Sequence, residues 1–91
     1  MPHSSHRGDL RLSIPADAAF HAVARDVAAR FAEYSGAAAA AAADLGKAVE
    51  RLASRMNGKT IEFAMERREH VLTVHATSGA ASEDASCPLP D

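Results

Sequence analysis

The chain has little of several residue types, and each shortage excludes a class of protein. It has no tryptophan, and its one cysteine, Cys87, excludes an internal disulfide and a cysteine-rich zinc cluster. The formal net charge of -2 provides no basic excess for binding nucleic-acid phosphates. No apolar run approaches the roughly 18 residues of a membrane span, and the opening residues lack the apolar region of a secretory signal. These absences predict a cytoplasmic protein that binds neither nucleic acid nor membrane.

The length of 91 residues allows one small domain with a thin core. Hydrophobic residues make up 47% of the chain and charged residues 24%, as in ordinary globular proteins, but alanine supplies much of the apolar share. Because a small core stabilises the fold weakly, a partner or a second copy is expected to add stability.

The first half of the chain predicts one strand and one helix. Residues 10–14 alternate apolar and polar side chains, as a strand with one buried face does, and Pro15 follows where the strand should stop. After Asp17, a residue that can cap a helix, apolar residues recur every three or four positions up to Ser35-Gly36. This stripe consists of Phe20, Val23, Val27, Phe31 and Tyr34. The spacing predicts a helix over residues 18–34.

A second helix begins in the seven alanines at 37–43 and ends at Asn57-Gly58, two residues that tolerate a left-handed cap. Its apolar stripe comprises Leu45, Ala48, Val49, Leu52, Ala53 and Met56. The period then changes to two over residues 60–66 and 71–75, with turn residues at 67–69 between them, and this alternation predicts a β-hairpin.

The predicted architecture is α+β, a two-layer sandwich in the order β-α-α-β-β with both helices on one face of a small mixed sheet. Residues 1–9 are predicted to be a flexible N-terminus, residues 10–77 a single domain, and residues 78–91 a disordered tail, because that tail is rich in small, acidic and proline residues. One core is expected to contain Phe31, Val49, Leu52, Phe63 and Leu72.

Three stretches, LRLSIPADAAFHAVARDVAARFAEYSG, DLGKAVERLASRMNG and KTIEFAMERREHVLTVHATSG, together resemble a known fold. They are similar to the N-terminal part of the histidine-kinase-like ATPase superfamily, and most similar to its bacterial anti-sigma factor serine kinases. The resemblance spans residues 10 to about 79. It implies a cytoplasmic regulator of bacterial transcription whose partner is a sigma factor or the antagonist of one.

The same resemblance implies that the nucleotide site is degenerate. When the apolar pairs of the second helix are aligned with the family, Arg51 and Arg55 occupy the positions of its base Glu and its Mg²⁺-binding Asn. Glu50 and Ser54 reach those positions only after a one-residue slip, which rotates side chains by roughly 100° and loses the phase of the apolar stripe. The Asp-x-Gly-x-Gly box and the ATP lid have no counterpart. No catalytic, cofactor-binding or metal residue is therefore expected, and Glu50, Ser54, Arg51 and Arg55 are candidates only for an altered site.

The hypothesis favoured by the sequence is a non-catalytic protein-interaction module, a truncated anti-sigma relative that has lost its nucleotide site. One alternative is a nucleotide-binding serine kinase that uses ATP and Mg²⁺ at an altered site containing Glu50 and Ser54, and another is an unrelated small α/β binding module. Since the strand at about 70–75 is expected to end the sheet, its open edge predicts a homodimer or strand addition by a protein partner.

Overall fold

A computed structural model describes residues 9–56 and 58–90 of the chain. Its elements are β1 (Leu10–Pro15), the short 3-10 helix η2 (Ala18–Phe20), α1 (His21–Tyr34), α2 (Ala39–Ser54), β2 (Thr60–Arg68), β3 (Val71–Ser78) and β4 (Ala81–Pro88). The predicted helices and the predicted hairpin are confirmed, although the hairpin turns at residues 69–70. None of the helices among the described residues is long and apolar enough to cross a membrane.

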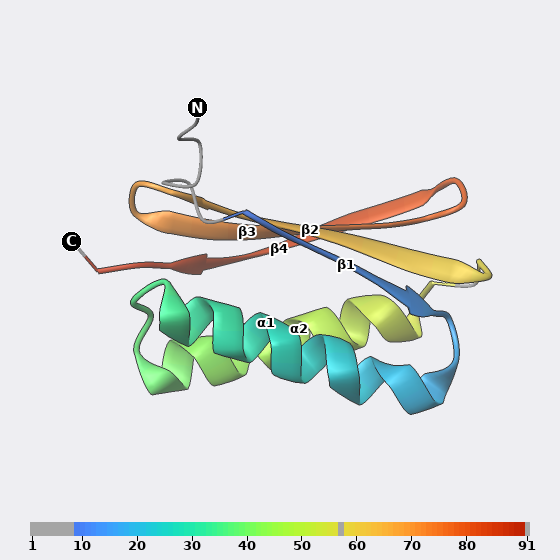
Figure 1. Cartoon of the computed structure of the whole chain (residues 1–91), viewed down its shortest axis with the longest axis horizontal. Helices are drawn as coiled ribbons and strands as arrows, with labels where there is room; N and C mark the ends of the chain where they lie inside the picture. Colours follow the sequence, from blue (N-terminus) through green and yellow to red (C-terminus); the bar gives the residue numbers. More distant parts are fainter. Residues whose placement is uncertain (1–8, 57, 91) are drawn as a thin grey trace.

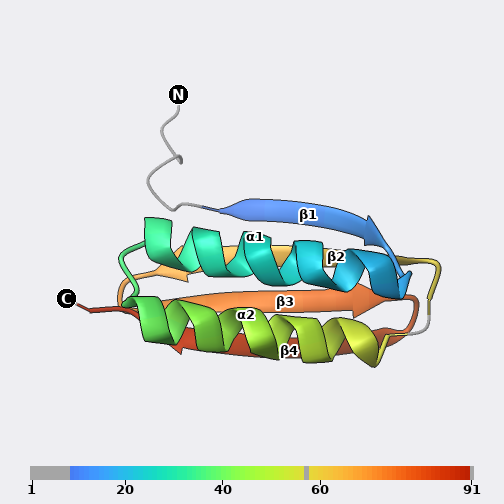
Figure 2. The same ribbon diagram turned by 90° about the horizontal axis from the view of Figure 1, so that it is seen from below.

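The elements form two layers, with a four-stranded sheet in the order β1-β2-β3-β4 on one side and both helices on the other (Figure 1). The two-layer α+β prediction is confirmed. The sheet is antiparallel throughout and not mixed, with every neighbouring pair of strands antiparallel. Strands β1 and β2 are antiparallel because α1 and α2, which connect them, run in opposite directions (Figure 2). The chain therefore returns to the end of the sheet at which β1 finished, and β2 starts there.

The prediction of a disordered tail over 78–91 is wrong for the residues that form β4. This strand pairs with β3 from Ala81, opposite Ser78, to Pro88, opposite Val71. Cys87 in β4 and Leu89 just beyond it are buried against the other layer. The strand was missed because its inward positions carry mostly small or charged residues, so it has almost no apolar alternation. The predicted flexible N-terminus, residues 1–9, lies outside the described residues except for Asp9.

The fourth strand also changes the edges of the sheet. Since β3 pairs with β2 on one side and β4 on the other, the prediction that residues 70–75 form an open edge is wrong. The edges are β1 and β4, and Figure 2 shows α1 beneath the β1–β2 side and α2 beneath the β3–β4 side.

The core lies between the two layers and is formed mainly by α2 and the inner face of the sheet. Of the five predicted core residues, Val49, Leu52, Phe63 and Leu72 are buried, whereas Phe31 of α1 is only half-buried. Other fully buried side chains come from the same sheet face, namely Ile61, Met65 and Val74. The largest buried side chains therefore come from β2, β3 and α2.

The side chains that helix α1 buries completely in this core are all small. Its buried residues are Ala24, Ala28 and Ala32. The helices approach so closely that a Cβ atom on Gly46 of α2 would lie 2.9 Å from the carbonyl oxygen of Arg25 in α1. The bulky side chains of α1 lie on the adjoining side of the helix, where Val27 and Phe31 pack only partly against the core.

A second close contact joins the start of β2 to the end of β3. The buried Ser78 hydroxyl accepts a hydrogen bond from the Gly58 amide at 3.1 Å and donates one to the Thr60 carbonyl oxygen at 3.0 Å. A Cβ atom on Gly58 would lie 2.2 Å from that hydroxyl oxygen. The glycine that follows α2 thus allows the chain to enter β2 against β3.

Candidate functional site

The candidate site is a surface made by the outer side of α1 and the adjoining strand β1, which we call the α1–β1 flank. Val23 is 43% exposed, Phe20 39% and Tyr34 87%, although all three belong to the apolar stripe predicted from the sequence. Val27 and Phe31 complete the stripe and are half-buried against the core. A row of large apolar side chains that water contacts marks an interaction surface more often than single exposed residues do.

One end of the flank is hollowed. A shallow depression of about 460 Å³ lies between β1 and α1. Its lining residues are Leu10, Asp26, Val27, Arg30, Phe31 and Tyr34. Asp26 and Arg30 place opposite charges one helical turn apart beside the apolar side chains. An apolar groove with a charged rim resembles a protein-binding surface more closely than a catalytic pocket, which needs an enclosed site.

The flank continues onto the open edge of β1, which pairs only with β2. Beyond the strand, the amide of Ala16 donates to the carbonyl oxygen of Lys59 at 3.0 Å, so its backbone groups point toward β2. Backbone groups alternate sides along an antiparallel strand. The amides of Arg11 and Ser13 therefore point to the open edge, together with the carbonyl groups of Arg11, Ser13 and Pro15.

The structure does not bring the predicted nucleotide-site residues into one cavity. The Glu50 carboxylate lies on the side of α2 that faces α1, where Oε1 is 3.4 Å from Nη1 of Arg25. A hydrogen bond from Arg25 to Asp26, together with the charge of Glu50, raises the pKa of Arg25 above its ordinary value. Glu50 thus already has a partner in the fold.

The other three candidates point elsewhere. Ser54 donates a hydrogen bond to the Arg51 carbonyl oxygen at 2.8 Å, and both of these side chains are exposed. Arg55 forms an ion pair with Glu83 of β4, with Nη1 and Oε1 2.7 Å apart. None of the four candidates lines a depression described here. Arg51 and Arg55 therefore do not converge on a common anion.

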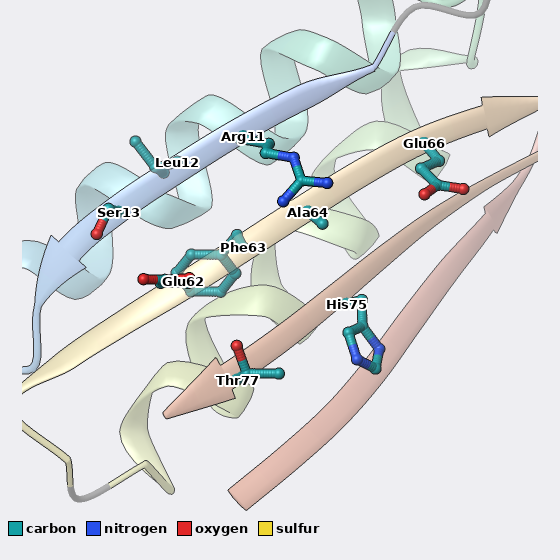
Figure 3. Close-up of a pocket in the computed structure, with 9 residues that line it drawn as sticks. All are labelled: Arg11, Leu12, Ser13, Glu62, Phe63, Ala64, Glu66, His75 and Thr77. Carbon is teal, nitrogen blue, oxygen red and sulfur yellow. The ribbon is translucent and has the colours of Figure 1, made fainter. Parts of the chain in front are cut away.

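The outer face of the sheet carries a second, polar depression of about 450 Å³. Figure 3 shows its lining, in which Arg11 from β1 reaches over Ala64 of β2, Glu66 lies further along β2 and His75 lies on β3. The small side chain of Ala64 creates the hollow, because its neighbours in the register, Arg11 and His75, are much larger. This face is open to water.

His75 and Asp84 form the most conspicuous pair on this face. They are register partners on β3 and β4, and Nδ1 of His75 contacts Oδ1 of Asp84. The side chains are 50% and 61% exposed, respectively. A hydrated pair of this kind lacks the water-excluded, fixed surroundings that electrostatic catalysis requires. We assign it a cross-strand structural role.

Metal and thiol chemistry have no site among the described residues. In this part of the chain, no cluster of three or more histidine, cysteine, aspartate or glutamate side chains could hold a metal ion. Cys87 is buried, and this burial, assisted by the charge of Asp44, raises the pKa of its thiol. A buried neutral thiol is a poor nucleophile.

Comparison of the chain with protein-family models, curated proteins and solved structures finds no match. The resemblance to anti-sigma ATPases therefore stays a prediction, and the candidate site depends on the geometry alone.

Sequence reasoning identified the residues of the flank but not their position. The helical period groups Phe20, Val23, Val27, Phe31 and Tyr34 on one stripe, yet period alone does not say whether that stripe faces a sheet or water. The sequence did contain a pattern that could have shown which side of the helix is buried, namely a second stripe on the same helix. Ala24, Ala28 and Ala32 recur every four residues, and this small-residue stripe is the one that is buried.

Proposed function

We propose that this protein is a non-catalytic protein-interaction module that binds through the α1–β1 flank. The observation that carries the proposal is the row of large apolar side chains on α1 that the fold leaves in contact with water beside an open strand edge. Complete burial of such a side chain contributes roughly 1.5–3 kcal/mol, and each partly exposed residue of the row leaves a share of that contribution unused. Binding of a protein partner recovers that contribution.

The surroundings of the polar residues considered for a nucleotide site or for catalysis support a function without catalysis. Glu50 and Arg55 have ion-pair partners within the fold, and the His75–Asp84 pair is hydrated. The resemblance extends the proposal to a regulator in the bacterial cytoplasm that acts on a sigma factor or its antagonist.

A matched pair of valines tests the surface. Val23 on the flank is 43% exposed and Val71 on the outer sheet face is 38% exposed, so Val23→Asp and Val71→Asp introduce the same charge at similar exposure. The parent and both variants are immobilised, and proteins retained from native cells are identified by mass spectrometry. We expect a partner that the parent and Val71→Asp retain and Val23→Asp loses. Equal retention by both variants would place the binding surface elsewhere.

Calorimetric titration with Mg-ATP tests the absence of catalysis. We expect no saturable heat, because a site lacking two or three polar contacts binds very roughly 10² to 10⁴ times more weakly than an intact site. Saturable binding with a dissociation constant below about 100 μM, abolished by Glu50→Gln, would contradict the proposal and favour an altered nucleotide site.

A further inference from the structure

The two edges of the sheet differ in their suitability for pairing with another strand. Strand β1 carries one charged side chain, Arg11, which projects from the outer sheet face, and it borders the apolar stripe of α1. Strand β4 carries Glu83 and Asp84 in succession, and it borders α2, whose large apolar side chains are buried. Both strands end at a proline, so the charges make the difference, and charges are a common means of preventing edge pairing. Only the β1 edge is free of acidic residues.

We infer that the occupant of the α1–β1 flank is a second copy of this chain, joined by antiparallel pairing of β1 with β1 about a two-fold axis at Leu12. The inference rests on the proposed function, since it names the partner of the same surface. The pairing extends the sheet across both copies and places the two α1 helices side by side beneath it.

The backbone favours this register. With the axis at Leu12, Arg11 of one copy lies opposite Ser13 of the other, so each open amide at these two positions meets an open carbonyl group. Pro15 has no amide to offer, and this register does not require one. The two Arg11 guanidinium groups are not direct partners, which avoids opposing like charges in one cross-strand pair.

The helices fit the same arrangement. Since α1 lies beneath the β1–β2 side of the sheet (Figure 2), the two-fold axis would make the two α1 helices neighbours beneath the joined sheet. Leu10 lines the same depression as Val27, Phe31 and Tyr34. Because β1 and α1 run in opposite directions (Figure 2), Leu12, which is about 7 Å further along β1, lies about one helical turn nearer the start of α1. Val23 and Val27 would then lie nearest the axis.

The apolar surfaces are also self-complementary. Antiparallel α1 helices would set Val23 and Val27 of one copy against those of the other. The two Leu12 side chains, which are partly buried in the monomer, would complete an inner layer continuous with both cores. The occupant that satisfies the strand edge and the apolar stripe at once is therefore a second copy.

Sedimentation equilibrium at micromolar concentrations tests the inference. We expect the parent to be a dimer. Ser13→Pro removes an open-edge amide from each copy and should raise the dimer dissociation constant about 10- to 100-fold. The matched control is Ser86→Pro on the other edge strand. Like Ser13, Ser86 lies two residues before a proline, and it lies on the outer face of the sheet opposite Thr73. That control should leave the dimer unchanged.

If Ser13→Pro fails to fold, a variant of α1 and a cysteine cross-link test the same dimer independently. Val23→Asp should dissociate the dimer while Val71→Asp does not, with circular dichroism confirming that both are folded. Residues opposite themselves at a non-hydrogen-bonded pair are close enough for a disulfide, so Leu12→Cys should cross-link on oxidation. Ser86→Cys should not. Cross-linking of Leu12→Cys would establish the register.

A monomeric parent at tens of micromolar, or a dimer that survives both Ser13→Pro and Val23→Asp, would overturn the inference. In either case the proposed function is judged separately by the retention experiment. A monomeric parent that still retains a different protein through Val23 would keep the flank as a binding surface and replace the second copy with that protein.

Discussion

Helices α1 and α2 have similar apolar periodicity and cover the same sheet, yet they use their large side chains differently. Helix α2 buries Leu45, Val49 and Leu52 between the layers. Helix α1 buries only alanines and leaves Val23 and Tyr34 in water. One helix therefore buries its bulky residues completely, whereas the other buries only small residues completely and leaves its bulky ones half-buried or exposed. Amphipathicity shows that a helix has an apolar side but not what that side contacts.

The largest effect should come from removing β4, which lies on the α2 side of the molecule. Ending the chain after Gly79 deletes the strand and exposes β3, including the buried Leu72 and Val74. We expect loss of cooperative folding, because a domain of this size has little stability to spare. Thermal unfolding followed by circular dichroism checks this. A variant that melts within about 5 °C of the parent would mean that β4 contributes less than roughly 1 kcal/mol.

A matched pair of truncations compares the helices directly. Leu52→Ala removes a buried side chain of α2 and should destabilise the fold by about 2–5 kcal/mol. Val23→Ala on the exposed stripe of α1 should change stability by about 0.5 kcal/mol or less, measured under conditions where the parent is monomeric. Urea denaturation gives both values. Similar costs for the two variants would remove the distinction between the helices.

The close contact between the helices gives a smaller effect of defined sign. On propensity alone, Gly46→Ala should stabilise α2 by up to about 1 kcal/mol. Its Cβ atom would, however, lie 2.9 Å from a backbone oxygen of α1, and overpacking of this kind typically costs about 1–3 kcal/mol. We therefore expect net destabilisation in urea, whereas a stabilised variant would show that the helices can separate at no cost.

The smallest effect concerns Cys87, which packs on the α2 side. Because burial raises the pKa of its thiol in the folded state, the unfolded chain loses this proton at lower pH than the folded chain does. The contribution of the thiol to stability is fully present below the unfolded pKa of about 8.5 and is lost as the pH rises through the folded pKa. We expect unfolding free energy to fall above about pH 8.5 and Cys87→Ala to reduce that decline. An unchanged pH profile would contradict this.

Much of the fold could be read from local patterns. The alternation at 60–66 and 71–75 predicted the hairpin, and breaks at Ser35-Gly36 and Asn57-Gly58 marked the helix ends, because side-chain period and backbone tolerance are local properties. The candidate site was less accessible. Its five apolar residues were recognised as one helical stripe, of which Phe31 was expected in the core, and the open edge was assigned to the wrong strand.

By itself, the sequence determined which segments become helices and strands, and which side chains share a face. Only the tertiary structure decided that β4 closes the sheet beside β3 and that α1 buries Ala24 and Ala28 while Arg25 approaches Gly46 of α2. The physical reason is that both outcomes depend on distant partners. A strand of small and polar residues is held by the backbone of its neighbour, and a helix with two possible packing stripes buries the one that lets another helix approach most closely.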